Sequence, residues 1–180
     1  VERFFFEDED YSMQAQAAGF RCVVVESAYV FHAQHQSVRS LPDREALFRR
    51  NQQWCHRKWG SWRRIAVVRT APVKPGSEEL RRFLEQVLAW TRRRSFLYLY
   101  SPLPSGVSGR DLFRSVGLVP HANVQWHDLA GPYASWVATW KILKRQKKRF
   151  TAIVAPTPMW ARRMRWLRPL HRAAVLTELT

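Results

Sequence analysis

Residues 65–100 read IAVVRTAPVKPGSEELRRFLEQVLAWTRRRSFLYLY. A β-branched run at 65–69 and an apolar run at 95–100 enclose a helical pattern at 77–93. Ser77 is a favourable N-cap residue, and the acids at 78 and 79 fall in the first turn, where the helix dipole stabilises them. Two apolar strands separated by a helix predict a right-handed β-α-β unit with parallel strands.

The same alternation continues to the end of the chain. Helical patterns occur at 109–116, at 133–148 and from Pro158 onward, and strand patterns at 123–127 and 150–155. This order predicts a Rossmann-like α/β domain with a mostly parallel sheet. The glycine spacing of a dinucleotide-binding loop is absent from the sequence, so the alternation predicts a Rossmann-like fold without its nucleotide-binding motif.

Charge divides the chain into two parts. Of 30 Lys and Arg and 14 Asp and Glu, residues 1–60 hold eight of each, so the net charge of +16 resides entirely in residues 61–180. Such asymmetry predicts two units with different surroundings, which we place at 1–61 and 62–180. No apolar run is long enough to span a membrane, and two cysteines fit a reducing compartment.

The first unit begins with an aromatic run and four consecutive acids, Phe4-Phe-Phe-Glu-Asp-Glu-Asp10. Asp10 is a favourable N-cap for a short helix over 11–18 that ends at Gly19. The run at 20–25 predicts a strand, with extended chain at 29–32. A second helix is expected over 44–58, and its expected buried side chains are Leu47, Phe48 and Trp54.

The order of these residues resembles the C-terminal catalytic part of family 2 glycosyltransferases, which have the GT-A fold. The resemblance covers about residues 1–61, and the stretch Arg57-Lys-Trp-Gly60 resembles that family's tail. The matching residues are Phe4, Glu7, Asp8, Asp10, Ser12, Ala15, Gly19, Phe20, Arg21, Ala28 and His32.

The resemblance implies an inverting sugar transfer from a nucleotide-sugar to an acceptor hydroxyl. Asp8 takes the place of the general base, with Glu7 beside it at the acceptor site. Asp10 and Gln14 fall at acceptor-side or structural positions, and many relatives carry Arg where this chain has Gln14. His32 takes the place of a residue that contacts the metal or the diphosphate.

The resemblance also implies a divalent metal, Mn or Mg, held mostly by the donor-binding half that precedes this stretch in the family. Asp8-Glu-Asp10 spells the Asp-x-Asp signature of that metal site, but here it precedes a helix and matches the base motif instead. We therefore expect the chain to be a fragment, inactive without the donor-binding half. The expected setting is cell-surface glycan or polysaccharide synthesis in the cytoplasm, with a glycan or lipid-linked acceptor.

The second unit contains two helices that combine Trp with Lys and Arg. Three readings remain open for them: tryptophans packed on the sheet with solvated cations, a peripheral anionic membrane surface, or nucleic-acid binding, which we favour least. The residues expected on such a surface are Trp136, Trp140, Lys144, Lys147, Lys148, Arg162 and Arg163.

A rival interpretation makes the whole chain a non-enzymatic basic module that binds nucleic acid or an anionic membrane. In that case the acidic run only stabilises a helix N-terminus. The transferase interpretation instead requires one of these carboxylates to be available to a substrate hydroxyl.

Overall fold

A computed structural model describes residues 5–23, 25, 27–31, 41–129, 131, 133–144 and 148–178. The chain forms two compact units, Val1–Ser61 and Trp62–Thr180. Most contacts of each unit are internal to it.

The first unit contains helices α1 (Glu7–Ala17) and α3 (Arg44–Trp59). Gly19 stops the first helix as expected, since it has a φ of +88° and its amide bonds back to the helix. The predicted cap was wrong: α1 begins at Glu7, four residues before the expected start at Tyr11, so that Asp10 lies inside the helix. All four acids therefore form the first turn instead of preceding the helix.

The predicted strand at 20–25 is also wrong for the part of this segment that the structure describes, which has no strand pairing. The large apolar side chains that the structure describes between positions 20 and 31 are exposed instead: Phe20, Val23, Val25, Tyr29, Val30 and Phe31. A strand needs a neighbour to bond its backbone groups, and none of the described residues of this unit supplies one.

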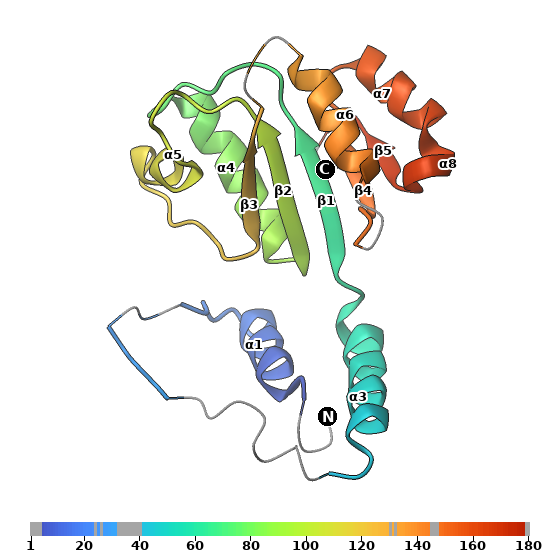
Figure 1. The fold of residues 1–180 in the computed structure, drawn as a ribbon. Helices are drawn as coiled ribbons and strands as arrows, with labels where there is room; N and C mark the ends of the chain where they lie inside the picture. Colours follow the sequence, from blue (N-terminus) through green and yellow to red (C-terminus); the bar gives the residue numbers. More distant parts are fainter. Residues whose placement is uncertain are drawn as a thin grey trace. The chain divides into compact units, whose positions relative to one another are not determined.

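The second unit is a Rossmann-like α/β fold with a five-stranded, all-parallel sheet in the order β3-β2-β1-β4-β5 (Figure 1). Its strands are β1 (Arg63–Val68), β2 (Ser95–Ser101), β3 (Val124–Asp128), β4 (Ala152–Val154) and β5 (Ala174–Leu176). The central strand β1 is covered on both faces, which explains its continuous apolar sequence.

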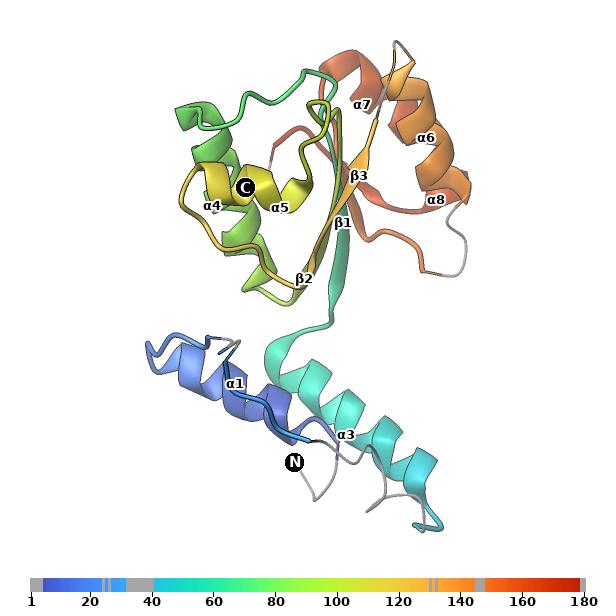
Figure 2. The ribbon, with the colours of Figure 1, turned by 60° about the vertical axis from the view of Figure 1, so that its left-hand side comes forward.

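Helices cover the two faces of this sheet in sequence order (Figure 2). One face carries α4 (Glu78–Thr91) and α5 (Gly109–Ser115), and the other carries α6 (Ala134–Lys144), α7 (Pro158–Trp166) and α8 (Arg168–His171). Alternate residues of β1 serve the two cores: Ile65 and Val67 face α4, whereas Ala66 and Val68 face α6 and α7.

The chain after Pro158 differs from the prediction of one continuing helix. It ends α7 at Trp166, forms the short helix α8 and then adds β5 to the edge of the sheet. Arg172 makes this change of direction with a φ of +58°. The buried ring of His171 donates from Nε2 to Met164 O and accepts at Nδ1 from Ala173 N. A strand of three residues has too short a pattern to be distinguished from a helix end.

Close packing fixes one glycine of this unit. Gly109 opens α5, and a Cβ placed on it would lie 2.8 Å from Cβ of Trp126. We expect Gly109→Ala to lower the free energy of unfolding by about 1–3 kcal/mol, because the helix must move off β3. Denaturant unfolding measures this, with the exposed neighbour Arg110→Ala as a control that changes stability by less than about 0.5 kcal/mol. Equal stability of the two variants would contradict the packing.

Candidate functional site

The acidic turn of α1 follows an unusual backbone. Phe5 and Phe6, directly before Glu7, have φ of +68° and +70°. Bulky residues rarely adopt this left-handed region, and such strain persists where surrounding contacts hold it. Phe48 of α3 supplies contacts to both rings, with centroids 5.3 and 5.2 Å away, and Asn51 Nδ2 lies 3.4 Å from Phe5 O.

Asp10 connects α1 to the end of α3. It is 8% exposed, and its Oδ1 accepts hydrogen bonds from Lys58 Nζ at 2.8 Å and Trp59 Nε1 at 2.7 Å. Gln14, one turn later, donates to Oδ2 at 2.6 Å. Lys58 is in turn 4.8 Å from the ring centroids of Trp54 and of Trp59. Asp10 and Gln14 are therefore structural in this unit.

The charge of Asp10 is stabilised by these partners. Burial by itself raises the pKa of Asp10, because it removes the carboxylate from water, but the hydrogen bonds from Lys58 and Trp59 and the charge of Lys58 outweigh burial. The pKa of Asp10 therefore lies below its ordinary value of 3.8. The residue is a carboxylate at neutral pH and a poor candidate for a base that must accept a proton.

Glu7 and Asp8 belong to the same turn as Asp10, but unlike Asp10 both are exposed. Successive residues of an α-helix are about 100° apart, so Asp8 and Asp10 point about 200° apart around the axis. The sequence Asp8-Glu9-Asp10 thus cannot close on one ion in this helix. This turn therefore combines one exposed carboxylate, Asp8, with one that is buried and paired, Asp10.

The structure offers no ready metal site in the parts of the chain that it describes. No group of three or more His, Cys, Asp or Glu side chains lies close enough together there to hold an ion. His32, predicted to contact a metal or diphosphate, lies outside the described residues. Cys22 is exposed and Cys55 is buried.

In the second unit, Trp136 and Trp140 do not pack on the sheet: they are 61% and 59% exposed. The Arg163 guanidinium lies 3.4 Å from the Trp136 ring centroid, and Lys144 Nζ lies 4.7 Å from that of Trp140. Arg162 and Lys148 are exposed, and Lys147 lies outside the described residues. The reading in which these tryptophans are buried is therefore wrong.

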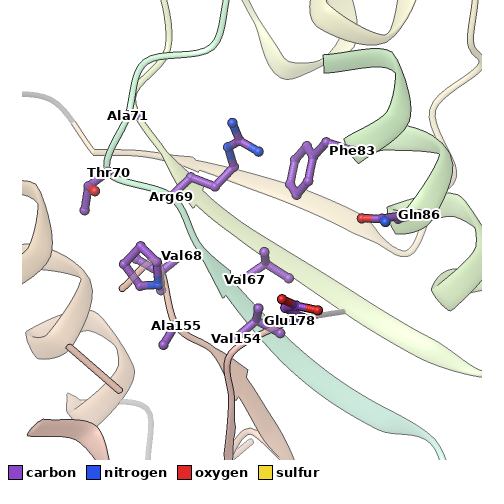
Figure 3. A pocket seen from close by; sticks show the side chains of 11 residues that line it. Val67, Val68, Arg69, Thr70, Ala71, Phe83, Gln86, Val154, Ala155 and Glu178 are labelled. Carbon is purple, nitrogen blue, oxygen red and sulfur yellow. The ribbon is translucent and has the colours of Figure 1, made fainter. Parts of the chain in front are cut away.

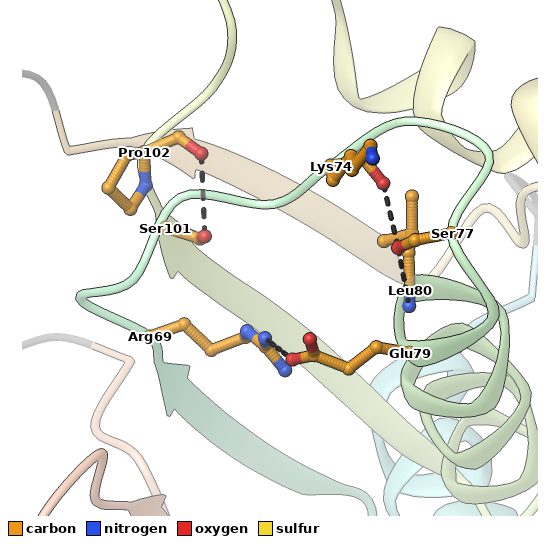
Figure 4. A network of polar contacts seen from close by, with 7 residues as sticks. All are labelled: Arg69, Lys74, Ser77, Glu79, Leu80, Ser101 and Pro102. Atoms are coloured by element: carbon orange, nitrogen blue, oxygen red, sulfur yellow. Dashed lines mark hydrogen bonds and ion pairs between the residues drawn. The ribbon is translucent and has the colours of Figure 1, made fainter.

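A cavity of about 370 Å³ opens where β1 and β4 end, at the point where the chain changes faces of the sheet (Figure 3). Ligands often bind at such points in parallel sheets. Here, however, the Arg69 guanidinium lies 4.6 Å from the Phe83 ring centroid and bonds Glu79 at 2.6 Å (Figure 4). With Glu178 also lining it, the cavity offers no uncompensated positive charge to an anion.

No protein-family model, curated protein or solved structure matches the chain. The case for function therefore depends on the residues and geometry described above.

We expect Asp10→Asn to loosen the first unit more than Asp8→Asn, although both remove one charge from the same turn. The first substitution weakens charge-assisted bonds worth about 1–3 kcal/mol, whereas the second affects only the helix dipole, by about 0.3–1 kcal/mol. Hydrogen exchange of the amides of α1 and α3 reports the difference. Equal protection in the two variants would contradict the structural role of Asp10.

The pH dependence follows from the lowered pKa of Asp10. A carboxyl whose pKa is lower folded than unfolded contributes stability above the unfolded value of 3.8 and loses it as pH falls through the folded pKa. We expect a ¹³C NMR titration to place the midpoint of the Asp10 carboxyl below 3.8. Protection of α1 should fall with protonation in the wild type and show a flatter dependence in Asp10→Asn. A midpoint above 3.8 would contradict the assignment of partners.

Proposed function

We propose that residues 1–61 are the acceptor-side end of an inverting family 2 glycosyltransferase of GT-A fold, with Asp8 as its general base. The observation that carries this proposal is the division between two carboxylates of one helical turn. Asp10 is buried and paired to the end of α3, and Asp8 is exposed. A base needs a carboxylate that is held in place and still open to the hydroxyl.

The contact between the two ends of the family-like segment supports the proposal. The Glu-Asp-x-Asp motif and the Lys58-Trp59 tail are about fifty residues apart in sequence, and both were part of the resemblance. Asp10 bonds directly to both tail residues. If the resemblance to the family were a coincidence, there would be no reason for the two matching stretches to contact each other.

Backbone strain before Glu7 is a second support. Strained residues concentrate at active sites, because the fold must stabilise a geometry that the chain avoids. A helix whose acids served only the dipole could begin with an unstrained Ser or Asp cap. Here two phenylalanines in the left-handed region precede the turn, and α1 has no side-chain cap.

In the proposed reaction, the acceptor hydroxyl gives its proton to the Asp8 carboxylate as its oxygen attacks the anomeric carbon of the donor sugar. The new C–O bond forms on the face opposite the diphosphate, and the bond from the anomeric carbon to the phosphate oxygen breaks. Its electron pair leaves with the nucleoside diphosphate, so the anomeric configuration inverts. Glu7 lies beside the base on the acceptor side.

The acidic turn does not provide a complete set of ligands for the divalent ion that the family resemblance implies. Asp10 is already bonded, and Asp8 points away from it. No step is therefore derived through a metal. In this proposal the exposed side chains of Phe20, Val23 and Phe31 are covered by a donor-binding half of the kind that the family resemblance implies.

The test compares the wild-type protein with two variants, all assayed with a panel of nucleotide-sugars. We expect Asp8→Asn to lower the transfer rate by roughly 10²–10⁴-fold, the usual contribution of a general base. Glu9→Gln, the adjacent acid, should leave the rate nearly unchanged. Thermal melting of each variant shows that the loss does not come from unfolding.

An Asp8→Asn enzyme with the wild-type rate would contradict the proposal and leave Asp8 as a helix-stabilising acid. Equal losses in Asp8→Asn and Glu9→Gln would also contradict it, because they would reflect the charge of the turn and not one base.

A further inference from the structure

The outer face of α6, α7 and α8 exposes large apolar side chains of a kind that protein surfaces usually bury. We call it the tryptophan face. On α7 it includes Met159, Arg162, Arg163 and Trp166, which follow one another at helical spacing. Met159 is 82% exposed and Trp166 is 83% exposed. The remaining exposed apolar members are Tyr133, Trp136, Trp140 and Leu170.

The exposed sides of the two helices adjoin. Arg163 of α7 lies over the ring of Trp136 of α6, and Trp160 Nε1 donates to Ser135 O at 3.3 Å. The buried sides of the same helices, with Ala138, Ile142, Ala161 and Met164, belong to one core. The exposed Trp136 and Trp140 are thus not needed to cover the sheet, whereas Trp160 belongs to the core.

Charge on this side of the sheet has one sign. Between Asp128 and Glu178 the sequence contains no Asp or Glu but eleven Lys and Arg. The opposite side differs, because in α4 the cations Arg81 and Arg82 pair with Glu85 and Glu78. The helices α6, α7 and α8, which lie on the side of the exposed tryptophans, therefore contain Lys and Arg and no Asp or Glu.

We propose that the tryptophan face binds the surface of a bilayer that contains anionic phospholipid. Indole rings favour the headgroup region of a membrane, where the ring is dehydrated and its N–H finds a partner. Lys and Arg around them attract anionic headgroups. Met159 and Leu170 add aliphatic side chains, which suit acyl chains and give nucleic acid nothing to stack on.

Two cation–ring contacts order this surface before binding. Lys144 lies over the ring of Trp140 and Arg163 over that of Trp136. Each cation and its ring can therefore contact the same lipid headgroup. Among the described residues, no helix is long and apolar enough to cross a bilayer. The proposed binding is therefore to the surface, and it stands or fails independently of the sugar transfer proposed for residues 1–61.

The test is flotation of the 180-residue chain with phosphatidylcholine vesicles that contain or lack phosphatidylglycerol, at low salt. We expect binding only to the anionic vesicles. Trp136→Ala/Trp140→Ala should weaken it roughly tenfold, because two rings leave the headgroup layer. Circular dichroism checks that this variant is folded, and both side chains are exposed enough for the fold to survive.

A matched pair of double variants separates the face from the overall charge. Arg162→Ala/Arg163→Ala should weaken vesicle binding by roughly 30-fold, from about 1 kcal/mol per cation near the membrane. Arg81→Ala/Arg82→Ala, on α4, removes the same charge and should change binding little. Equal losses in the two variants would overturn the proposal.

Failure of the wild type to float with anionic vesicles would also overturn it. A parallel titration with a duplex oligonucleotide covers the other anionic partner. If the duplex binds through Trp136 and Trp140 and the vesicles do not, the face is a nucleic-acid surface and the membrane proposal is wrong.

Discussion

The buried carboxylate of Asp10 is the constraint on which the first unit depends. It lies between Lys58, Trp59 and Gln14, so one side chain holds α1 against the end of α3. Removing its charge weakens both bonds, because Lys58 and Trp59 would then donate to a neutral oxygen. The same pairing fixes the rotation of α1 about its axis and thereby the direction of Asp8. Under the proposal for Asp8, the buried Asp10 is therefore the residue that positions the base.

The second unit depends on a different constraint, the covering of both faces of a parallel sheet. The apolar sides of its helices pack on the sheet, so the core does not constrain which residues lie on their solvent-facing sides. On α4, Arg81 and Arg82 form ion pairs with Glu85 and Glu78. Helices α6 and α7 instead expose tryptophans among Lys and Arg and contain no Asp or Glu. If both proposals hold, the second unit would bring a transferase to a membrane surface where lipid-linked acceptors are found.

The sequence predicted the parallel α/β unit well because its two central strands, β1 and β2, are long and mostly apolar and flank the capped helix α4. Ser77 caps α4 as expected, with its Oγ accepting from Leu80 N at 3.2 Å. The prediction from sequence failed where the partners of a residue lie far away along the chain. Asp10 looks like an N-cap locally, and only its bonds to Lys58 and Trp59, forty-eight and forty-nine residues away, make it an interior residue of the helix. Asn51 and Cys55 were missed on the buried side of α3 because neither stands out by hydrophobicity, and β5 because three residues carry too little pattern.

The most direct test of the central claim is a structure of the natural protein with its donor, in an unreactive form, and its acceptor. The account predicts that the acceptor hydroxyl lies within about 2.6–3.2 Å of the Asp8 carboxylate, while Asp10 keeps its bonds to Lys58 and Trp59. An acceptor bound elsewhere, with Asp8 turned to solvent, would contradict the account.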